Sequence, residues 1–190
     1  LELCFTNGTP PHMNHIHRVL VLLLLSGPFL IQPFSMAQSS TSPNTALNAR
    51  EQGIVAVSAA TARGDMATLK SALAAGLDAG LTVNETKEVL VQLYAYCGFP
   101  RSLNALGTFM ELVQERGDKD ALGPTPGPLP AGSSLDFGTA NQTRLIGAPV
   151  TGALMAFAPA IDEFLKAHLF GDIFARDNLD WRTREIVTIA

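Results

Sequence analysis

The sequence predicts an all-α fold, and three of its features support that prediction. Apolar residues recur at steps of three and four along most of the chain, which is the spacing of one face of a helix. Residues that favour helix N-caps and C-caps stand at the ends of these segments. No stretch alternates polar and apolar residues for long enough to indicate a sheet.

The first two helices are expected between residues 48 and 80. Asn48 is a suitable N-cap, and Glu51 stands three residues later as the second half of a capping box. This helix should end near Gly64, and Asp65 can cap the next one. The second helix carries one apolar face, formed by Met66, Leu69, Leu73 and Leu77.

Two more helices follow with little chain between them. Thr82 and Glu85 form another capping box, and Gly98 is a natural end for the helix that they begin. Pro100 then stands where a first-turn proline is tolerated. The fourth helix carries an apolar stripe formed by Leu103, Leu106, Met110 and Val113.

The second half of the sequence is less regular. Residues 123–128 consist of Gly, Pro and Thr only, so they predict a linker. Residues 136–151 favour neither helix nor loop. Helix resumes near Pro159, with a break at about residues 171–178. A last helix starts at about Asp180 and shows no stop signal before Ala190, so we expect a truncated sequence.

The N-terminal region is typical of an export signal. Met13 is the first methionine, and it begins a short basic segment that an apolar run follows at residues 19–31. Small residues at Ser35 and Ala37 fit a cleavage site. The apolar run is shorter than the ~20 residues of a membrane span, so a signal peptide is favoured over an anchor. We expect a periplasmic or secreted protein without stable membrane insertion after cleavage.

These features divide the chain into six segments. We expect upstream translation at 1–12, a signal peptide at 13–37, a flexible leader at 38–46, a first helical unit at 47–116, a linker at 117–135 and the start of a second unit at 136–190. Residues 179–187 align without gaps on residues 47–55, pairing Arg50 with Arg182 and Ile54 with Ile186. The match indicates either an internal duplication or two similar helix starts that arose by chance.

Composition argues against several classes of function. The net charge is -4 and basic residues are scattered, which disfavours nucleic-acid binding. The two cysteines, Cys4 and Cys97, form neither a CxxC pair nor a metal-ligand spacing. His168 has no second ligand at helical spacing, so no metal site is expected. We expect no cofactor.

One segment resembles a known family. Ala79-Gly80-Leu81-Thr82 is followed by Glu85 and Glu88, and then by Gly98-Phe99-Pro100-Arg101 and Asn104-Ala105-Leu106. This order resembles carboxymuconolactone decarboxylase family proteins over residues 47–113, and residues 157–190 resemble the opening of the family's unit again. The resemblance implies an all-helical, alkylhydroperoxidase D-like fold, a ring-like homo-oligomer and a small-molecule substrate.

In that family the active unit carries a Glu, then about twelve positions later a CxxC pair or its substitutes, and a His four positions beyond. In the first unit these positions are Gly53, Asp65, Thr68 and Ala72, so the resemblance implies a structural role for that unit. In the second unit the Glu position is Glu185, and the other positions would lie beyond Ala190. Glu185 is therefore a candidate catalytic residue. The alternative is a solvated first-turn carboxylate, close in sequence to Arg182 and Arg184, that the helix dipole favours.

Three further residues are weaker candidates. Cys97 is either a peroxidatic thiol, with Arg101 favouring the thiolate, or a small core residue. Arg101 and Asn104 lie one helical turn apart and either bind a substrate carboxylate or form cap or interface hydrogen bonds.

The resemblance implies a lyase that decarboxylates a small lactone or carboxylic acid, with most of its active site after Ala190. The alternatives are a thiol peroxidase or disulfide reductase of the same fold, and an exported helical oligomer that binds a small acid without catalysis. The 190-residue chain itself is expected to be inactive. We also expect it to be poorly stable, because its last helix would leave Ile186, Val187 and Ile189 without packing partners.

Overall fold

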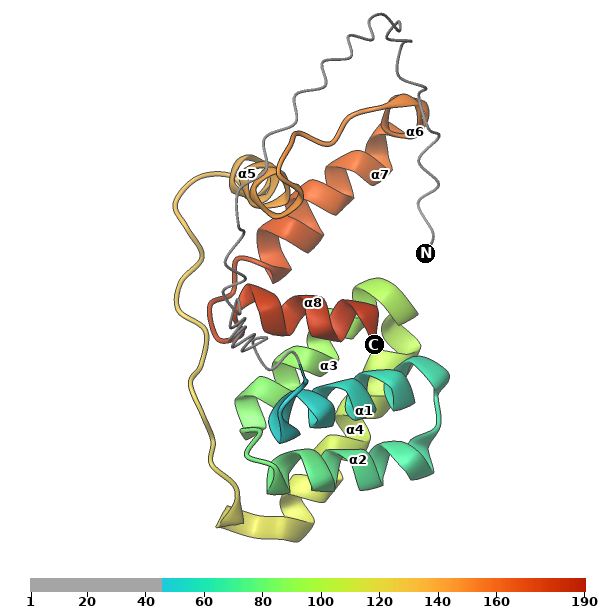
Figure 1. Ribbon diagram of the computed structural model, residues 1–190, viewed down its shortest axis with the longest axis vertical. Helices are drawn as coiled ribbons and strands as arrows, with labels where there is room; N and C mark the ends of the chain where they lie inside the picture. Colours follow the sequence, from blue (N-terminus) through green and yellow to red (C-terminus); the bar gives the residue numbers. More distant parts are fainter. Residues whose placement is uncertain (1–45) are drawn as a thin grey trace, which may run out of the picture. The chain divides into compact units, whose positions relative to one another are not determined.

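The computed structural model describes residues 46–190, and within this part of the chain the regular structure is helical with no strand (Figure 1). The all-α prediction is confirmed. The elements are α1 (Ala49–Arg63), α2 (Met66–Asp78), α3 (Val83–Cys97), α4 (Phe99–Arg116), η1 (Gly117–Lys119), α5 (Ser134–Ile146), α6 (Ala153–Phe157), α7 (Pro159–Phe164), η2 (Leu165–Ile173) and α8 (Trp181–Ile189). The predicted signal peptide and nearly all of the predicted leader lie outside the described residues. Among residues 46–190 no helix has the length and apolar character needed to cross a membrane.

The helix ends follow the capping residues of the sequence. The Asn48 side chain accepts a hydrogen bond from the Glu51 backbone at 2.9 Å, and the Glu51 carboxylate accepts one from the Asn48 backbone at 2.9 Å. Thr82 and Glu85 form the same reciprocal box at the start of α3. Gly98 ends α3 with φ of 84°, a conformation that costs little for glycine. Both predicted capping boxes are therefore confirmed.

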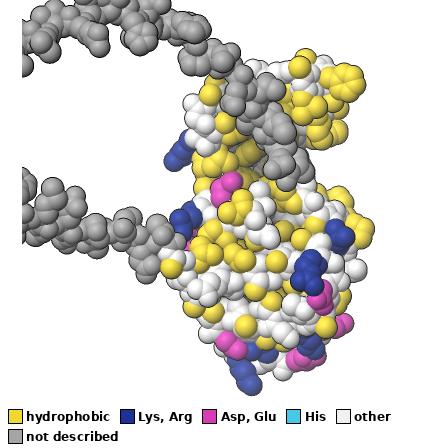
Figure 2. Space-filling model, turned by 45° about the vertical axis from the view of Figure 1, so that its right-hand side comes forward, with side chains coloured by type: hydrophobic (Ala, Val, Ile, Leu, Met, Phe, Trp, Pro, Cys, Tyr) yellow, Lys and Arg dark blue, Asp and Glu magenta, His cyan; other side chains and the backbone are white. Residues whose placement is uncertain are grey.

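Apolar side chains also remain at the surface. Figure 2 shows one face, on which they gather in groups between scattered charged side chains. Short helices α6 and α7 expose four large apolar residues within eleven positions, namely Leu154, Phe157, Ile161 and Phe164. Exposed groups of this kind mark surfaces that contact other molecules.

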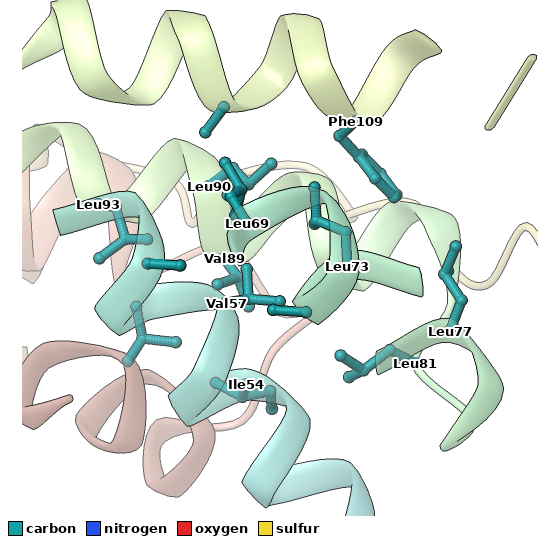
Figure 3. Packing of buried hydrophobic residues seen from close by; sticks show 14 of the residues in the cluster. Ile54, Val57, Leu69, Leu73, Leu77, Leu81, Val89, Leu90, Leu93 and Phe109 are labelled. Carbon is teal, nitrogen blue, oxygen red and sulfur yellow. The ribbon is translucent and has the colours of Figure 1, made fainter. Parts of the chain in front are cut away.

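The main core lies between α1, α2, α3, α4 and α8 (Figure 3). Its most buried members include Ile54, Val57, Leu69, Leu73, Leu90 and Phe109. Ile186 and Val187 of α8 belong to the same core and are 7% and 1% exposed. The expectation that they would lack partners is therefore wrong, because α8 packs on α1 and α3. Ile189 is 80% exposed, as that expectation required.

The predicted linker is extended from Asp120 to Ser133, apart from bends, and hydrogen-bonds to the helical core. The backbone N–H of Val83 donates to the carbonyl of Ala121 at 3.0 Å, and that of Asn84 donates to Leu122 at 2.9 Å. Further along, the Gly127 N–H donates to Asp177 at 2.7 Å. The segment is therefore held at residues 121–122 and again at Gly127.

The region that the sequence left undecided is helical. It forms α5, which crosses the π-helical segment η2 at backbone contact distance. A Cβ atom on Gly138 would lie 2.0 Å from the carbonyl oxygen of Lys166, and one on Gly171 would lie 2.5 Å from that of Ser134. Only glycine fits at both positions. The helix break expected from residue 171 starts later, because η2 runs to Ile173.

Candidate functional site

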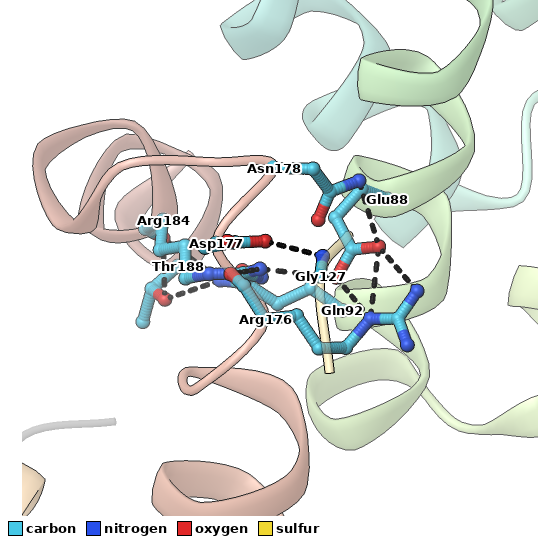
Figure 4. A network of polar contacts seen from close by, with 8 residues as sticks. All are labelled: Glu88, Gln92, Gly127, Arg176, Asp177, Asn178, Arg184 and Thr188. Atoms are coloured by element: carbon cyan, nitrogen blue, oxygen red, sulfur yellow. Dashed lines mark hydrogen bonds and ion pairs between the residues drawn. The ribbon is translucent and has the colours of Figure 1, made fainter. Parts of the chain in front are cut away.

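The centre of the candidate site is a buried ion pair between Glu88 of α3 and Arg184 of α8 (Figure 4). Arg184 is 0% exposed and Glu88 is 2% exposed. Arg184 Nη2 donates to Glu88 Oε1 at 3.0 Å, and its Nη1 donates to Gln92 Oε1 at 3.0 Å. The Gln92 amide donates in return to the Arg184 carbonyl at 2.8 Å. These contacts join α8 to α3.

A second arginine binds the same carboxylate from the loop before α8. Arg176 Nε lies 2.8 and 3.0 Å from the two Glu88 oxygens, and its Nη2 lies 3.0 Å from Oε2. Asn178 adds an amide donor at 3.2 Å. Arg184 also donates to the Arg176 carbonyl at 2.6 Å, so the two arginines hold one another in place.

The charges of this network do not cancel. Two guanidinium groups surround a single carboxylate, which leaves one positive charge in excess. Burial opposes ionisation of Glu88, but hydrogen bonds from Arg176 and Arg184 outweigh it and hold the pKa of Glu88 below its ordinary value. Burial lowers the pKa of Arg184, and its pairing with Glu88 opposes that effect.

Two buried polar atoms of the network have no hydrogen-bond partner within residues 46–190. They are Nε of Arg184 and Oδ1 of Asn178. A donor and an acceptor left over in a buried site are usually satisfied by ordered water. The network therefore has unused hydrogen-bonding capacity on both of these side chains.

Glu185, the candidate catalytic residue, lies on α8 directly after Arg184 and is partly buried. Its two arginine neighbours bind elsewhere: Arg184 binds Glu88, and Arg182 donates to Glu51 at 3.0 Å. In the described part of the chain, Glu185 forms neither a hydrogen bond nor an ion pair. Burial without a counter-charge raises the pKa of Glu185. Glu185 is therefore partly buried and is paired with neither arginine.

Tyr96 of α3 is the polar neighbour of Glu185. Its hydroxyl accepts a hydrogen bond from Thr188 Oγ1 at 3.1 Å. Partial burial and the nearby Glu185 carboxylate raise the pKa of Tyr96. Tyr96 is 43% exposed, so this end of the α3–α8 contact reaches solvent. Glu185, Tyr96 and Thr188 therefore bring a carboxyl and two hydroxyl groups to one accessible edge.

The three weaker candidates do not join that edge by any described contact. The Cys97 thiol donates to the Leu93 carbonyl at 3.1 Å, and burial raises the pKa of Cys97 despite the charge of Arg101. A raised pKa disfavours the reactive thiolate. Cys97 also packs against the main core, as the core interpretation requires. Arg101 and Asn104 are both exposed on α4.

The family comparison agrees with the sequence resemblance. Residues 29–110 match the model of the "Carboxymuconolactone decarboxylase family". This part of the chain is therefore similar to carboxymuconolactone decarboxylase family proteins. The match ends within α4, before the linker, and so does not include α5 to α8. No match was found among the curated proteins.

The positions that the sequence resemblance assigned to reactive groups in the first unit have structural roles. Gly53 lies where a Cβ atom would come within 3.1 Å of the Gly76 Cα, so it permits the close contact of α1 and α2. Asp65 caps α2 and accepts hydrogen bonds from the Thr68 backbone at 3.1 Å and hydroxyl at 2.7 Å. Ala72 is buried in the core.

Sequence reasoning missed most of the buried network. Glu88 entered only as part of the family resemblance, and Gln92 and Arg176 were not singled out. One signal was present: Glu88 and Gln92 stand one turn apart among the apolar residues of α3, where unpaired polar side chains would be costly. Their partners lie 88 to 96 residues away, so no local pattern identifies them.

Proposed function

We propose that this protein is a carboxymuconolactone decarboxylase-like lyase that acts on a small lactone or carboxylic acid, with Glu185 as a proton-transferring group. The observation that carries the proposal is the environment of Glu185: a partly buried carboxyl with a raised pKa, flanked in sequence by two arginines that bind other residues. Perturbed carboxyls of this kind are frequent at catalytic sites.

The chemistry of decarboxylation suits such a group. When the C–C bond to the carboxylate breaks, carbon dioxide leaves and its bonding electrons stay on the substrate carbon. That carbon then takes a proton, which the neutral Glu185 carboxyl would donate before it is reprotonated from water. A pKa nearer to neutrality makes more of the carboxyl available in its acid form. Tyr96 would orient the substrate through its exposed hydroxyl.

The remaining steps of the proposal concern the state of the protein in the cell. We propose that the protein is exported and that it self-associates. The exposed apolar residues of α6 and α7 support self-association because an oligomer would remove them from water. Light scattering coupled to size exclusion tests this step, and a monomer would contradict it.

The assay is release of carbon dioxide from carboxymuconolactone, measured with the full-length protein that the gene encodes. We expect turnover. Glu185→Gln should reduce kcat by about 10²-fold or more, the usual contribution of general acid–base catalysis. Glu111→Gln is the matched control, because Glu111 is exposed on α4.

The outcomes separate the three classes of function. Equal turnover in Glu185→Gln and in the control would remove Glu185 from the mechanism. Binding of the lactone without turnover would favour the non-catalytic oligomer. Peroxide consumption with a dithiol would favour the thiol peroxidase, which the raised pKa of Cys97 and its burial argue against.

A further inference from the structure

A second group of reactive side chains lies on η2, outside the Glu185 edge. His168 Nδ1 lies 2.7 Å from Oδ2 of Asp172, four residues later. The prediction that His168 has no second ligand at helical spacing is wrong, because Asp172 stands at such a spacing. A single carboxylate does not make a metal site, and residues 46–190 hold no group of three such ligands. The pair needs another explanation.

The fold holds Asp172 in place from the opposite side. Ser134 of α5 donates through Oγ to Asp172 Oδ1 at 2.6 Å. This contact exists because the α5–η2 crossing has glycine on both helices, at Gly138 and Gly171. Asn141 of α5 donates to the Phe170 carbonyl at 2.8 Å and so satisfies a backbone group of the π-helical turns. Long π-helical segments are rare and occur frequently at functional sites.

This arrangement determines which nitrogen of His168 is available. Burial raises the pKa of Asp172, but hydrogen bonds from Ser134 and His168 outweigh it and hold the pKa below its ordinary value. Asp172 is therefore a carboxylate at neutral pH, and Nδ1 of His168 must donate to it. Nε2 is left with its lone pair or a second proton. The His168 side chain is 50% exposed, so a ligand can reach Nε2.

Two aromatic rings lie beside the imidazole. The Tyr94 ring centroid is 5.5 Å from that of His168, and the Tyr94 ring stacks on Phe99 with centroids 4.3 Å apart and planes at 14°. Phe99 is 61% exposed although it is apolar. Tyr94 is partly buried, so the exposed Phe99 ring stacked on it offers a flat molecule a face, and the nearby imidazole offers a polar anchor.

We propose that His168, Tyr94 and Phe99 form a binding site for a small aromatic or conjugated acid. The acidic oxygen shares a proton with Nε2 of His168, and the flat part of the ligand packs on the exposed Phe99 ring and the accessible edge of Tyr94. Asp172 acts as a positioning residue, because it fixes the tautomer and orientation of the imidazole without touching the ligand. The site uses none of the residues assigned to proton transfer, so it stands independently of the proposed function.

The test uses benzoate as the probe and the nitrogen resonances of the His168 ring as the readout. The spectrum of the ¹⁵N-labelled chain is recorded at about pH 6.5, near the ordinary pKa of imidazole. The His168 signals are assigned by their loss in His168→Gln. We expect benzoate to shift Nε2 more than Nδ1. Cyclohexanecarboxylate, which is not flat, and benzyl alcohol, which is not acidic, should bind at least about tenfold more weakly, since each lacks one of the two interactions.

Variants test each part of the site. Phe99→Ala should weaken benzoate binding several-fold, whereas Phe157→Ala, which removes a ring that is 88% exposed on α6, should not. Asp172→Asn should populate the other tautomer of the His168 imidazole and so change its nitrogen resonances. If Asp172 had a purely structural role, these resonances would not change. Unchanged Nε2 signals at saturating benzoate, or equal binding of all three probes, would overturn the proposal. Absence of lactone decarboxylase activity would not affect this proposal.

Discussion

Replacing Glu88 with Gln should destabilise the protein more than any other single loss of charge in the described chain. The substitution keeps the size of the side chain but leaves the guanidinium groups of Arg176 and Arg184 without their shared carboxylate. Arg184 cannot turn to water, because it is 0% exposed. Breaking a buried ion pair on one side costs about 3–5 kcal/mol. We expect this loss in the free energy of unfolding.

The measurement is urea unfolding followed by circular dichroism at pH 7. A loss of about 3–5 kcal/mol corresponds to a fall in Tm of roughly 6–20 °C for a domain of this size. The control is Glu115→Gln, which breaks a pair with Lys70 whose side chains are 46% and 57% exposed. Such exposed pairs contribute about 0–1 kcal/mol. Similar losses in both variants would refute the reasoning, because burial would then not set the cost.

The pH dependence gives a second readout. The pKa of Glu88 is lower in the folded chain than its ordinary value of 4.5. Its stabilising contribution is therefore complete above about pH 5 and is lost as the pH falls through the folded pKa. Wild type and Glu88→Gln should converge in stability under acid conditions. A constant difference between them from pH 7 to pH 3 would contradict the assignment.

Three further predictions follow from single contacts. Gly138→Ala should disrupt the α5–η2 crossing and lower Tm sharply, because its Cβ would lie 2.0 Å from a carbonyl oxygen. Gly107→Ala on α4 is the control: its Cβ would meet open space, and the substitution should raise the free energy of unfolding by about 0.5–1 kcal/mol. Glu185→Gln should raise the free energy of unfolding at pH 7 but not below about pH 4. The reason is that the raised pKa of Glu185 makes its charged form less favourable in the folded chain than in the unfolded one. Equal stability of the variant and the wild type at pH 7 would contradict this. Cys97 should react with a disulfide reagent at pH 7 more slowly than a free cysteine, measured by mass on its peptide, and a faster reaction would show that its pKa is lowered instead.

Local features of the sequence could be predicted and long-range ones could not. The capping boxes at Asn48 and Thr82 involve residues three positions apart, so the sequence alone identifies them. Helix α5 was left undecided because only Gly138 and Gln142 of its thirteen residues are buried, which gives a weak apolar pattern. The crossing that stabilises it depends on contacts with η2, nearly thirty residues later.

The placement of α8 shows the same limit. Its apolar residues predicted a helix, but no local pattern indicated that Ile186 and Val187 pack into the core of α1 and α3. The buried Glu88–Arg184 pair fixes that packing, and its members are 96 residues apart. The candidate residue Glu185 could be found from the family pattern. Its raised pKa could not, because burial raises it, and the burial of Glu185 depends on how α8 packs on the core.

The buried network and the Glu185 edge are consequences of one another. Arg184 can serve as the buried counter-ion of Glu88 only if it points into the α3–α8 contact, and the next residue on the helix then points to a different side. Arg182 is drawn to Glu51 in the same way. Glu185 thus keeps a raised pKa although two of its nearest sequence neighbours carry positive charge. The contacts that hold α8 on the core therefore also remove the counter-charges that would fix Glu185 in its ionised form.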